Sequence, residues 1–224
     1  MKRLTLFAGH YGSGKTNVAI NYARELKKMG LPVVIADLDI VNPYFRTKDS
    51  EDELKKEGIE VLSSDYAGSN VDFPALPGSF YSLTDSHENY GVYDIGGDDR
   101  GAYALGRYKD AILKENNYDF LIVVNRFRPL AKTPKLAIEI KEEIENACGM
   151  KFTGIVNNSN LGDLTTAEDV LSSVEYAQII SEETGIPVKF TTVRQELEIE
   201  LQGKIPNLKS LKLQKKIYEN NEEL

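Results

Sequence analysis

The residues with the most distinctive spacing lie near the start of the chain, where Gly9 is followed by four residues and then by Gly-Lys-Thr. This segment, GHYGSGKT, matches the pattern G-x-x-x-x-G-K-[ST]. Gly12 and Gly14 allow backbone conformations that turn successive N–H groups toward an anion. Lys15 can supply charge to the β- and γ-phosphates of a nucleotide, and the Thr16 hydroxyl is a Mg²⁺ ligand. The predicted cofactor-binding residues of this phosphate loop are Gly9, His10, Tyr11, Gly12, Ser13, Gly14, Lys15, Thr16 and Asn17.

Two acidic segments follow at the ends of apolar runs. In GVYDIGG, Asp94 comes after the apolar residues and Gly97 completes a D-x-x-G pattern. An aspartate at a strand end also caps turns, but beside a phosphate loop we expect Asp94 to hold a hydrated metal ion together with Thr16. In VVIADLDIVNP, strand alternation places Asp37 and Asp39 on the same side. We expect one of them to face the γ-phosphate and the other to make structural hydrogen bonds.

The elements that must position these residues alternate between apolar, strand-like runs and longer helical patterns, which indicates βαβ units. The predicted fold class is α/β, a three-layer αβα sandwich with a mostly parallel sheet. The predicted strands are 3–8, 32–38, 59–62, 91–95, 119–125, 152–157 and 187–193. A first helix follows the phosphate loop and ends at Gly30, and further helices are predicted at 102–116, 133–147, 166–184 and 207–219.

The domain organisation predicted from this pattern is one nucleotide-binding domain over residues 1–224, with a C-terminal helix at about 207–220 packed on it. The least regular stretch, residues 64–90, is either a functional loop or a surface excursion with a short helix. The tail lacks the aromatic-rich apolar face of a membrane-binding helix.

Composition excludes several classes of protein. With 27 basic and 35 acidic residues the net charge is −8, which argues against a broad DNA-coating surface. No segment reaches the roughly 18 apolar residues of a membrane span. Cys148 is the single cysteine, so neither a disulfide framework nor a C-x-x-C metal site is expected within one chain. We therefore predict a cytoplasmic protein with no nucleic-acid or membrane partner.

The order of these motifs resembles the MinD/ParA group of the SIMIBI class of P-loop proteins, which also contains CobB/CobQ-type enzymes. The segments that carry the resemblance are GHYGSGKT, VVIADLDIVNP, VYDIGG and GIVNNSN. The resemblance implies that Asp39 belongs to switch I and orients the attacking water or the metal shell, and that Asp94 is the Mg²⁺-linked carboxylate. It also implies that Gly97 lies in switch II. The catalytic residues would then be Lys15, Asp39 and Asp94, and the metal-binding residues Thr16, Asp39 and Asp94.

The base-reading segment favours adenine. In the family an asparagine after a late strand reads the base, and Asn157 in GIVNNSN has that place in the order of motifs. A GTPase of this class would carry an aspartate, as in N-K-x-D, to pair with guanine. The chain has NRFRP after the strand at 119–125 and NNSN after the next, and neither contains that aspartate. The alternative role for Asn157 and Asn158 is turn formation.

The sequence departs from the family at the second residue of the loop. Most MinD/ParA ATPases have a signature lysine there that reaches across a nucleotide-sandwich dimer, whereas this chain has His10, followed by Tyr11. Histidine is shorter and only partly charged near neutral pH. Two roles for His10 follow, namely donation to a phosphate or packing beside the loop.

The function predicted from these residues is that of a Mg²⁺-dependent ATPase that acts as a nucleotide-dependent switch on a protein partner, with a nucleotide-dependent homodimer as one form. One alternative is an ATP-dependent small-molecule enzyme of the CobB/CobQ or dethiobiotin-synthetase kind, with residues 64–90 as substrate pocket. Others are a metallochaperone-type GTPase and a nucleotide-binding regulator with negligible catalysis.

Overall fold

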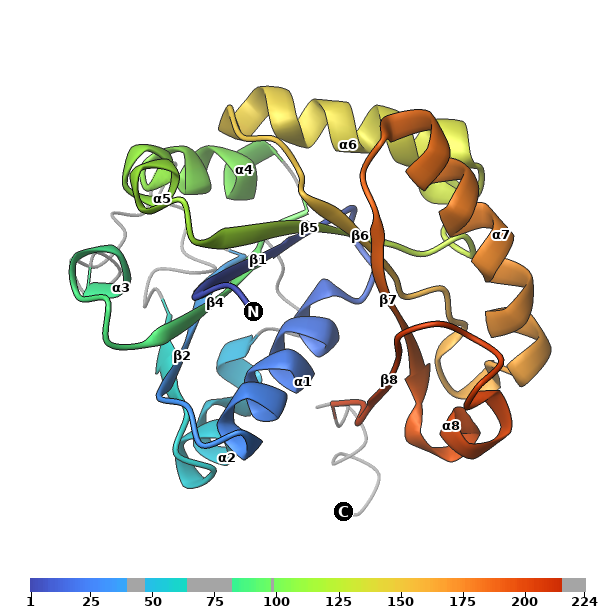
Figure 1. Cartoon of the computed structure of the whole chain (residues 1–224), viewed down its shortest axis with the longest axis horizontal. Coiled ribbons are helices and arrows are strands. Elements are labelled where there is room, and N and C mark those ends of the chain that lie inside the picture. The colour runs from blue at the N-terminus through green and yellow to red at the C-terminus, as the bar shows by residue number, and fades with distance from the viewer. Residues whose placement is uncertain (40–46, 64–81, 98, 215–224) are drawn as a thin grey trace, which may run out of the picture.

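The computed structural model describes residues 1–39, 47–63, 82–97 and 99–214, and its centre is a sheet of eight strands (Figure 1). The strand order is β3-β2-β4-β1-β5-β6-β7-β8, and every described pairing is parallel. All seven predicted strands are present, and the α/β fold class is confirmed. The strands are β1 (Leu4–Ala8), β2 (Val33–Leu38), β3 (Glu60–Leu62), β4 (Tyr90–Ile95), β5 (Tyr118–Val124), β6 (Gly154–Asn157), β7 (Val188–Arg194) and β8 (Leu208–Leu211).

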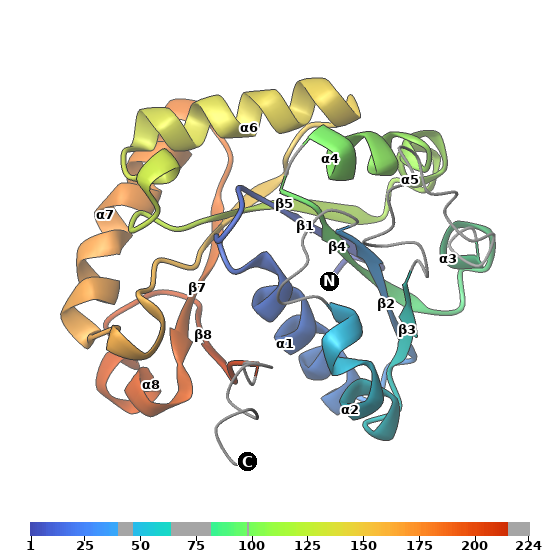
Figure 2. The ribbon, with the colours of Figure 1, turned by 180° about the vertical axis from the view of Figure 1, so that it is seen from behind.

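Helices cover both faces of this sheet. Figures 1 and 2 show α1 and α2 on one side and α4, α5, α6 and α7 on the other, which gives the predicted three layers. The helices are α1 (Lys15–Lys28), α2 (Glu51–Lys56), α3 (Ser82–Asp85), α4 (Asp99–Gly106), α5 (Lys109–Glu115), α6 (Pro134–Cys148), α7 (Ala167–Thr184) and α8 (Gln195–Leu201). Three short 3₁₀ turns complete the described elements: η1 (Thr47–Ser50), η3 (Pro129–Ala131) and η4 (Gly162–Leu164).

The two cores on either side of the sheet follow from strand alternation. Along β1, Leu4 and Leu6 face the core under α4 to α7, while Phe7 faces the core under α1. Because successive side chains of a strand point to opposite faces, a strand covered on both sides must be apolar at nearly every position. This is why the central strands read as continuous apolar runs in the sequence.

The strand order places the ends of β1, β2 and β4 together. The chain leaves β1 toward one edge of the sheet, through β2 and β3, and after β4 it crosses to the other side of β1. In open parallel sheets, ligands bind outside the carboxyl ends of the strands at such a reversal. In the register of the sheet Asp94 lies opposite Phe7 on one side and opposite Asp37 on the other. The acidic strand ends thus meet the loop that follows β1.

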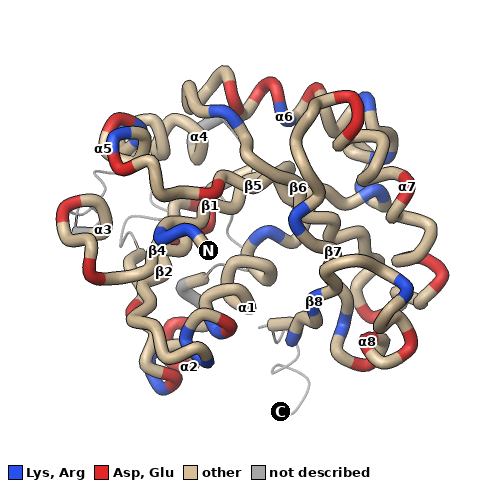
Figure 3. Tube along the Cα trace, in the orientation of Figure 1, with Lys and Arg blue, Asp and Glu red and all other residues tan. Residues whose placement is uncertain are grey.

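The charged residues of the surface helices are mixed in sign. Figure 3 shows Lys and Arg interspersed with Asp and Glu along α2, α5 and α6. Within α6, Lys141 lies 2.9 Å from Glu145, an i,i+4 pair.

Two sequence-based element predictions need correction, and two short helices were not predicted. The helix predicted from residue 207 is wrong at its start, because Leu208–Leu211 form the edge strand β8 beside β7, and residues 215–220 lie outside the described part of the chain. The apolar spacing of Leu208 and Leu211 suits a helix equally well, so only pairing with β7 decides the outcome. The helix predicted at 102–116 is two helices, which separate after Gly106. The helices α2 and α8, of six and seven residues, were not predicted.

Candidate functional site

The loop between β1 and α1 has the backbone conformation that the glycine pattern predicts. Gly12 and Gly14 have φ values of 77° and 84°, in the left-handed region that glycine adopts at low cost. A turn is closed inside the loop by a hydrogen bond of 3.0 Å from the Ser13 N–H to the His10 carbonyl. Gly14 precedes α1 without a side-chain cap, so the first N–H groups of the helix remain available to an anion.

The loop is also packed so tightly that other glycines are required. A Cβ atom on Gly9 would lie 2.4 Å from the carbonyl oxygen of Val123, and one on Gly97 would lie 2.7 Å from the Gly9 carbonyl. Both contacts involve backbone, which cannot move aside cheaply. Gly97 therefore lies directly against the loop, where a change in the loop would reach the segment after β4.

Lys15 is buried at the first position of α1 and forms an ion pair of 3.0 Å with Asp39, whose carboxylate is equally buried. Burial by itself disfavours the charged ammonium. The nearby carboxylates, Asp39 first and Asp94 next, outweigh burial and raise the pKa of Lys15 above its ordinary value. Lys15 therefore stays fully charged at physiological pH.

Asp94 is completely buried at the end of β4. Its Oδ2 accepts a hydrogen bond of 3.0 Å from the Thr47 hydroxyl, whereas its Oδ1 is buried with no hydrogen-bond partner. Burial raises the pKa of Asp94 to about 6, against the opposing effect of Lys15 and in the same direction as the Asp39 carboxylate. A carboxylate that is buried despite its desolvation free energy, and that has one oxygen without a hydrogen bond, is typical of a functional position.

The donor set around Asp94 fits Mg²⁺ bound together with a nucleotide. The Thr16 hydroxyl lies close enough to Asp94 to lower the pKa of its carboxyl, and the unsatisfied Asp94 oxygen is a hard ligand of the type Mg²⁺ prefers. Over the described ranges, no group of three or more His, Cys, Asp or Glu side chains is arranged to hold a metal by itself. This is expected where phosphates and water supply most of the ligands.

Asp37 and Asp39 make different contacts. The Oδ1 atom of Asp37 accepts a hydrogen bond of 3.0 Å from the Asp39 N–H, so Asp37 helps to fix the turn that follows β2. Asp39 is the member of the pair that contacts the lysine of the loop.

A cavity of about 340 Å³ opens at the loop and connects it to the carboxyl ends of the later strands. Its volume lies within the range of small-molecule sites. The predicted residues that line it are Tyr11, Gly12, Gly14, Lys15, Thr16 and Asn17. Residues that sequence reasoning did not select complete the lining: Arg128, Asn158, Asn160, Gly162, Leu211, Leu213 and Gln214.

Some predicted site residues lie outside this lining. His10 bonds through Nδ1 to the Tyr11 carbonyl at 2.9 Å and borders a small void behind the loop, so its geometry favours the packing role. Ser13 is buried, and its hydroxyl has no hydrogen-bond partner. Gly9 and Gly97 contribute through backbone packing, as described above.

The position of Asn157 does not fit its predicted role as the base-reading residue. Its side chain is completely buried, the Nδ2 group donates to the Ser173 hydroxyl at 2.8 Å, and Oδ1 accepts from the Ser159 hydroxyl at 2.7 Å. This geometry does not support a direct contact between Asn157 and a base. Asn158 and Asn160 border the cavity instead, and the run NNSN was the signal that contained them.

Arg128 is the cavity residue that sequence reasoning missed most completely. Its Nε donates a hydrogen bond of 2.7 Å to the Gly12 carbonyl. A Cβ atom added to Gly12 would lie 3.3 Å from the same Nε, so the guanidinium group packs directly on this glycine. The residue is exposed, stands in the segment NRFRP after β5, and adds a second cation at the mouth of the cavity.

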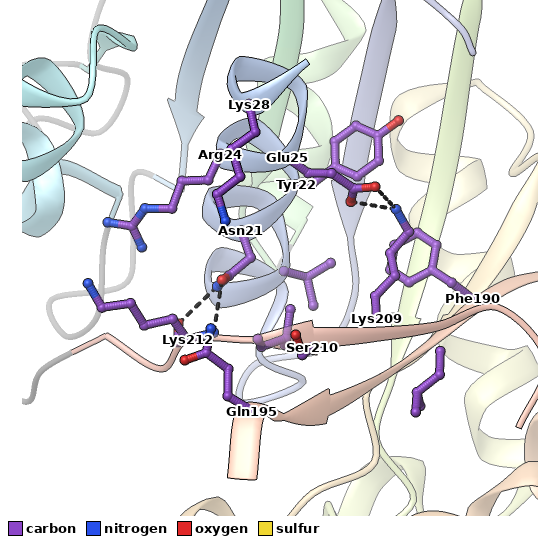
Figure 4. A pocket seen from close by; sticks show the side chains of 13 residues that line it. Asn21, Tyr22, Arg24, Glu25, Lys28, Phe190, Gln195, Lys209, Ser210 and Lys212 are labelled. Carbon is purple, nitrogen blue, oxygen red and sulfur yellow. Dashed lines mark hydrogen bonds and ion pairs between the residues drawn. The ribbon is translucent and has the colours of Figure 1, made fainter. Parts of the chain in front are cut away.

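A second cavity, of about 330 Å³, lies between α1 and β8 (Figure 4). Its cations are largely compensated within the chain, since Lys209 pairs with Glu25 and Lys212 pairs with Glu53. It contains neither the glycine loop nor the buried carboxylates. The chemistry therefore belongs to the cavity at the phosphate loop.

The sequence matches the family model for the CobQ/CobB/MinD/ParA nucleotide binding domain over residues 4–165, well over half of the chain. The chain belongs to this family. The resemblance drawn from its motifs is confirmed, and the matched range contains the phosphate loop and the buried carboxylates Asp37, Asp39 and Asp94. A comparison with curated protein sequences gave no match.

Solved structures of the same fold include the cell division protein FtsY from Thermotoga maritima, with a TM-score of 0.60 and 19% identity over 85% of this chain and 61% of that one. Another is the signal recognition particle receptor FtsY from Elizabethkingia anophelis in complex with GDP, at 0.55 and 18% over 86% and 58%. A third is the signal recognition particle 54 kDa protein from Aeropyrum pernix in complex with GDP, at 0.51 and 15% over 84% and 40%. At these identities the likeness shows the fold alone, and the chain spans at most 61% of each structure.

This CobQ/CobB/MinD/ParA family member is thus a nucleotide-binding P-loop protein of α/β fold. In the part of the chain that the structure describes, no helix combines the length and the apolar character needed to cross a membrane.

Proposed function

We propose that this protein is a Mg²⁺-dependent ATP-binding protein and ATPase that acts in the cytoplasm as a nucleotide-dependent switch on a protein partner. The observation that carries the proposal is the buried set of Lys15, Asp39 and Asp94 beneath the glycine loop, with one Asp94 oxygen unsatisfied. Burying ionised groups costs desolvation free energy, and such groups are found at sites where they bind a charged ligand.

Each residue has a definite task in the proposed reaction. The loop amides and Lys15 bind the β- and γ-phosphates, and Thr16 and Asp94 would hold Mg²⁺. The metal, when bound, neutralises charge on the phosphate oxygens. Lys15 exchanges its ion pair with Asp39 for the γ-phosphate, and this releases the Asp39 carboxylate to orient the attacking water.

The switch part of the proposal follows from what lies next to these groups. Gly97 packs on the Gly9 carbonyl, and the Thr47 hydroxyl donates to Asp94. Thr47 begins the turn η1, so a change at Asp94 reaches both the segment after β4 and the segment after β2. Such contacts are the type through which γ-phosphate loss reshapes switch segments, and a partner would bind one of the two shapes.

We propose ATP over GTP because of the residues that line the part of the cavity where the base would bind. No Asp or Glu is among its described lining residues, whereas guanine recognition uses a carboxylate. Asn160 takes the fourth position of NNSN, where an N-K-x-D sequence carries its aspartate. Its amide is already engaged, since Nδ2 donates to the Asn158 carbonyl at 2.7 Å and Oδ1 accepts from the Gly162 N–H at 3.1 Å.

The binding part of the proposal is tested with Lys15→Ala. We expect this variant to lose measurable Mg·ATP binding in isothermal titration calorimetry, with Lys55→Ala as the control because Lys55 is exposed and pairs only along its own helix. Asp39→Ala should keep ATP binding and lose turnover by about 100-fold or more, as expected for a group that positions the nucleophile. An unchanged dissociation constant for Lys15→Ala would end the proposal.

Base selectivity has a test of its own. Asn160→Asp should raise GTP affinity relative to ATP by roughly tenfold, because a charged acceptor is then offered to the guanine N–H groups. Asp163→Asn is the control, since Asp163 is mostly exposed, pairs with Arg194 and lies outside the described cavity lining. Tighter binding of GTP than ATP by the unaltered protein would refute the choice of adenine.

The same family includes CobQ and CobB, so a small-molecule enzyme is the second candidate. Residues 64–81 of the segment proposed as its substrate pocket lie outside the described part of the chain. The two functions differ in turnover. An enzyme that phosphorylates a carboxylate would hydrolyse little ATP until a small carboxylic acid is added, whereas a switch would respond to a partner protein.

A further inference from the structure

The chain beyond β8 is attached to α1 by two asparagine side chains. Asn21 binds both backbone groups of Lys212: its Oδ1 accepts from the Lys212 N–H and its Nδ2 donates to the Lys212 carbonyl, each at 2.9 Å (Figure 4). One turn earlier, Asn17 Oδ1 accepts from the Gln214 N–H at 2.9 Å. The two side chains thus bond the backbone of an extended segment as a neighbouring strand would.

We call the hydrogen bonds of Asn17 and Asn21 to residues 212 and 214 the asparagine clamp. Its spacing follows from the geometry of the helix and of the chain after β8. Residues four apart on a helix lie on one face, about 6 Å apart along the axis. Residues two apart in an extended chain lie about 6.6 Å apart and present their backbone groups to the same side. Asn17 and Asn21 therefore match the N–H groups of residues 212 and 214 with little distortion. The match requires hydrogen-bonding side chains at both helix positions.

The asparagine clamp places the end of the described chain beside the phosphate loop. Asn17 directly follows Thr16, and Leu211, Leu213 and Gln214 line the same cavity as the loop. Gln214 is fixed from a second side, because its Nε2 donates to the Ser50 hydroxyl at 2.8 Å. The segment thus supplies two leucine side chains to a cavity whose other end contains Lys15 and Arg128.

We infer that Asn17 and Asn21 are positioning residues that hold residues 211–214 as the wall against which the nucleoside of the bound nucleotide packs. The inference rests on the proposed function, because it assumes a nucleoside triphosphate with its phosphates on the loop. The apolar side chains of Leu211 and Leu213 suit the flat face of a purine, and ligand cavities combine such apolar walls with a few polar groups. The segment Asn158–Gly162 borders the same space.

The experiment compares two probes on the full-length protein, Mg·ATP and inorganic tripolyphosphate with Mg²⁺. Asn21→Ala should weaken Mg·ATP binding by about tenfold and leave tripolyphosphate binding within about twofold of the unaltered protein, because only the nucleoside uses the wall. Asn17→Ala should also weaken Mg·ATP binding. Melting temperatures are recorded for both, so that loss of folding is recognised.

The matched control is Lys209→Ala. Lys209 also joins β8 to α1, through an ion pair of 2.6 Å with Glu25, but it lies in the cavity of Figure 4 and not in the one at the phosphate loop. If a general loosening of β8 caused the effect, this variant would weaken ATP binding too, and the inference would be overturned.

The outcomes separate the inference from the function on which it rests. If the unaltered protein binds neither probe, the proposed function fails. If it binds both and Asn21→Ala binds them unchanged, or loses both equally, the proposed function stands and the nucleoside wall is refuted. Selective loss of ATP binding in Asn21→Ala, with the Lys209 control unchanged, supports the wall.

Discussion

Replacing Asp94 by asparagine should stabilise the protein in the absence of nucleotide while it weakens Mg²⁺-dependent binding. Asp94 is completely buried, one of its oxygens has no partner, and burial raises its pKa to about 6. At neutral pH the fold therefore holds an ionised carboxylate that would be more stable in water. An amide of nearly the same shape carries no charge to desolvate and can still accept from the Thr47 hydroxyl.

The magnitude follows from the pKa. A value of about 6 lies roughly two pH units above the ordinary 3.8, and at 1.36 kcal/mol per unit the ionised group costs about 3 kcal/mol of folding free energy. For a chain of this length, a change of that size corresponds to about 6–12 °C in Tm.

The pH dependence has a definite sign. The folded state binds the Asp94 proton more tightly than the unfolded state, so this group's contribution is favourable below pH 4 and is lost as the pH rises through 6. The advantage of Asp94→Asn should therefore be about half as large at pH 5 as at pH 7.5, where it reaches about 3 kcal/mol. Thermal or urea unfolding at pH 5.0, 6.0 and 7.5 without nucleotide measures it.

Glu145→Gln is the control of opposite sign. Glu145 is buried as well, but the hydrogen bonds from Lys151, Lys141 and the Phe152 N–H outweigh its desolvation and lower its pKa. That substitution should destabilise the protein at neutral pH.

Added Mg·ATP should raise the Tm of the unaltered protein and have little effect on Asp94→Asn, because ligand binding stabilises only the form that binds it. The reasoning is refuted if Asp94→Asn unfolds at or below the temperature of the unaltered protein at pH 7.5, or if the difference between them does not change with pH.

Three further substitutions test contacts at the phosphate loop and at the opposite end of the sheet. Gly9→Ala should cost about 1–3 kcal/mol of stability and at least tenfold in ATP affinity, because the new Cβ meets a β5 carbonyl at 2.4 Å; normal affinity by calorimetry would contradict this. Arg3→Met should cost about 3 kcal/mol in urea unfolding, because the nearly buried Glu115 carboxylate loses the guanidinium with which it pairs, and adding Glu115→Leu should restore much of the loss. Arg128→Ala should weaken ATP binding by roughly tenfold at low salt and less at high salt, since it removes an exposed cation bonded to the Gly12 carbonyl, with little change in Tm; a salt-independent effect would argue against a charge contact.

Local pattern was sufficient for the parts of this protein whose structure is dictated by neighbouring residues. The positive φ of Gly12 and Gly14 follows from residue type and spacing, as does the end of the first helix at Gly30, with φ 81°. The strands were predictable because a strand covered on both faces must be apolar throughout. The position of Asp94 followed in turn, since the carboxyl ends of parallel strands share one edge of the sheet.

Contacts between segments far apart in the chain were not predictable in this way. Asn157 and Asn158 are adjacent and identical, yet one is buried against Ser173 and the other borders the cavity. Strand alternation points their side chains in different directions, but only the packing of α7 on β6 determines which of the two contacts that helix. The helix α7 covers the side on which Asn157 lies.

By itself the sequence determined the phosphate loop, the first seven strands and the acidic residues at the strand ends, because each depends on a few adjacent residues. Only the tertiary structure decided that residues 208–211 pair with β7 as an edge strand, that Arg128 lies over Gly12, and that α1 binds the end of the described chain. Two of these contacts join residues that are more than 100 positions apart in the sequence. Such residues come together only when the whole sheet forms, so no local pattern predicts the contact.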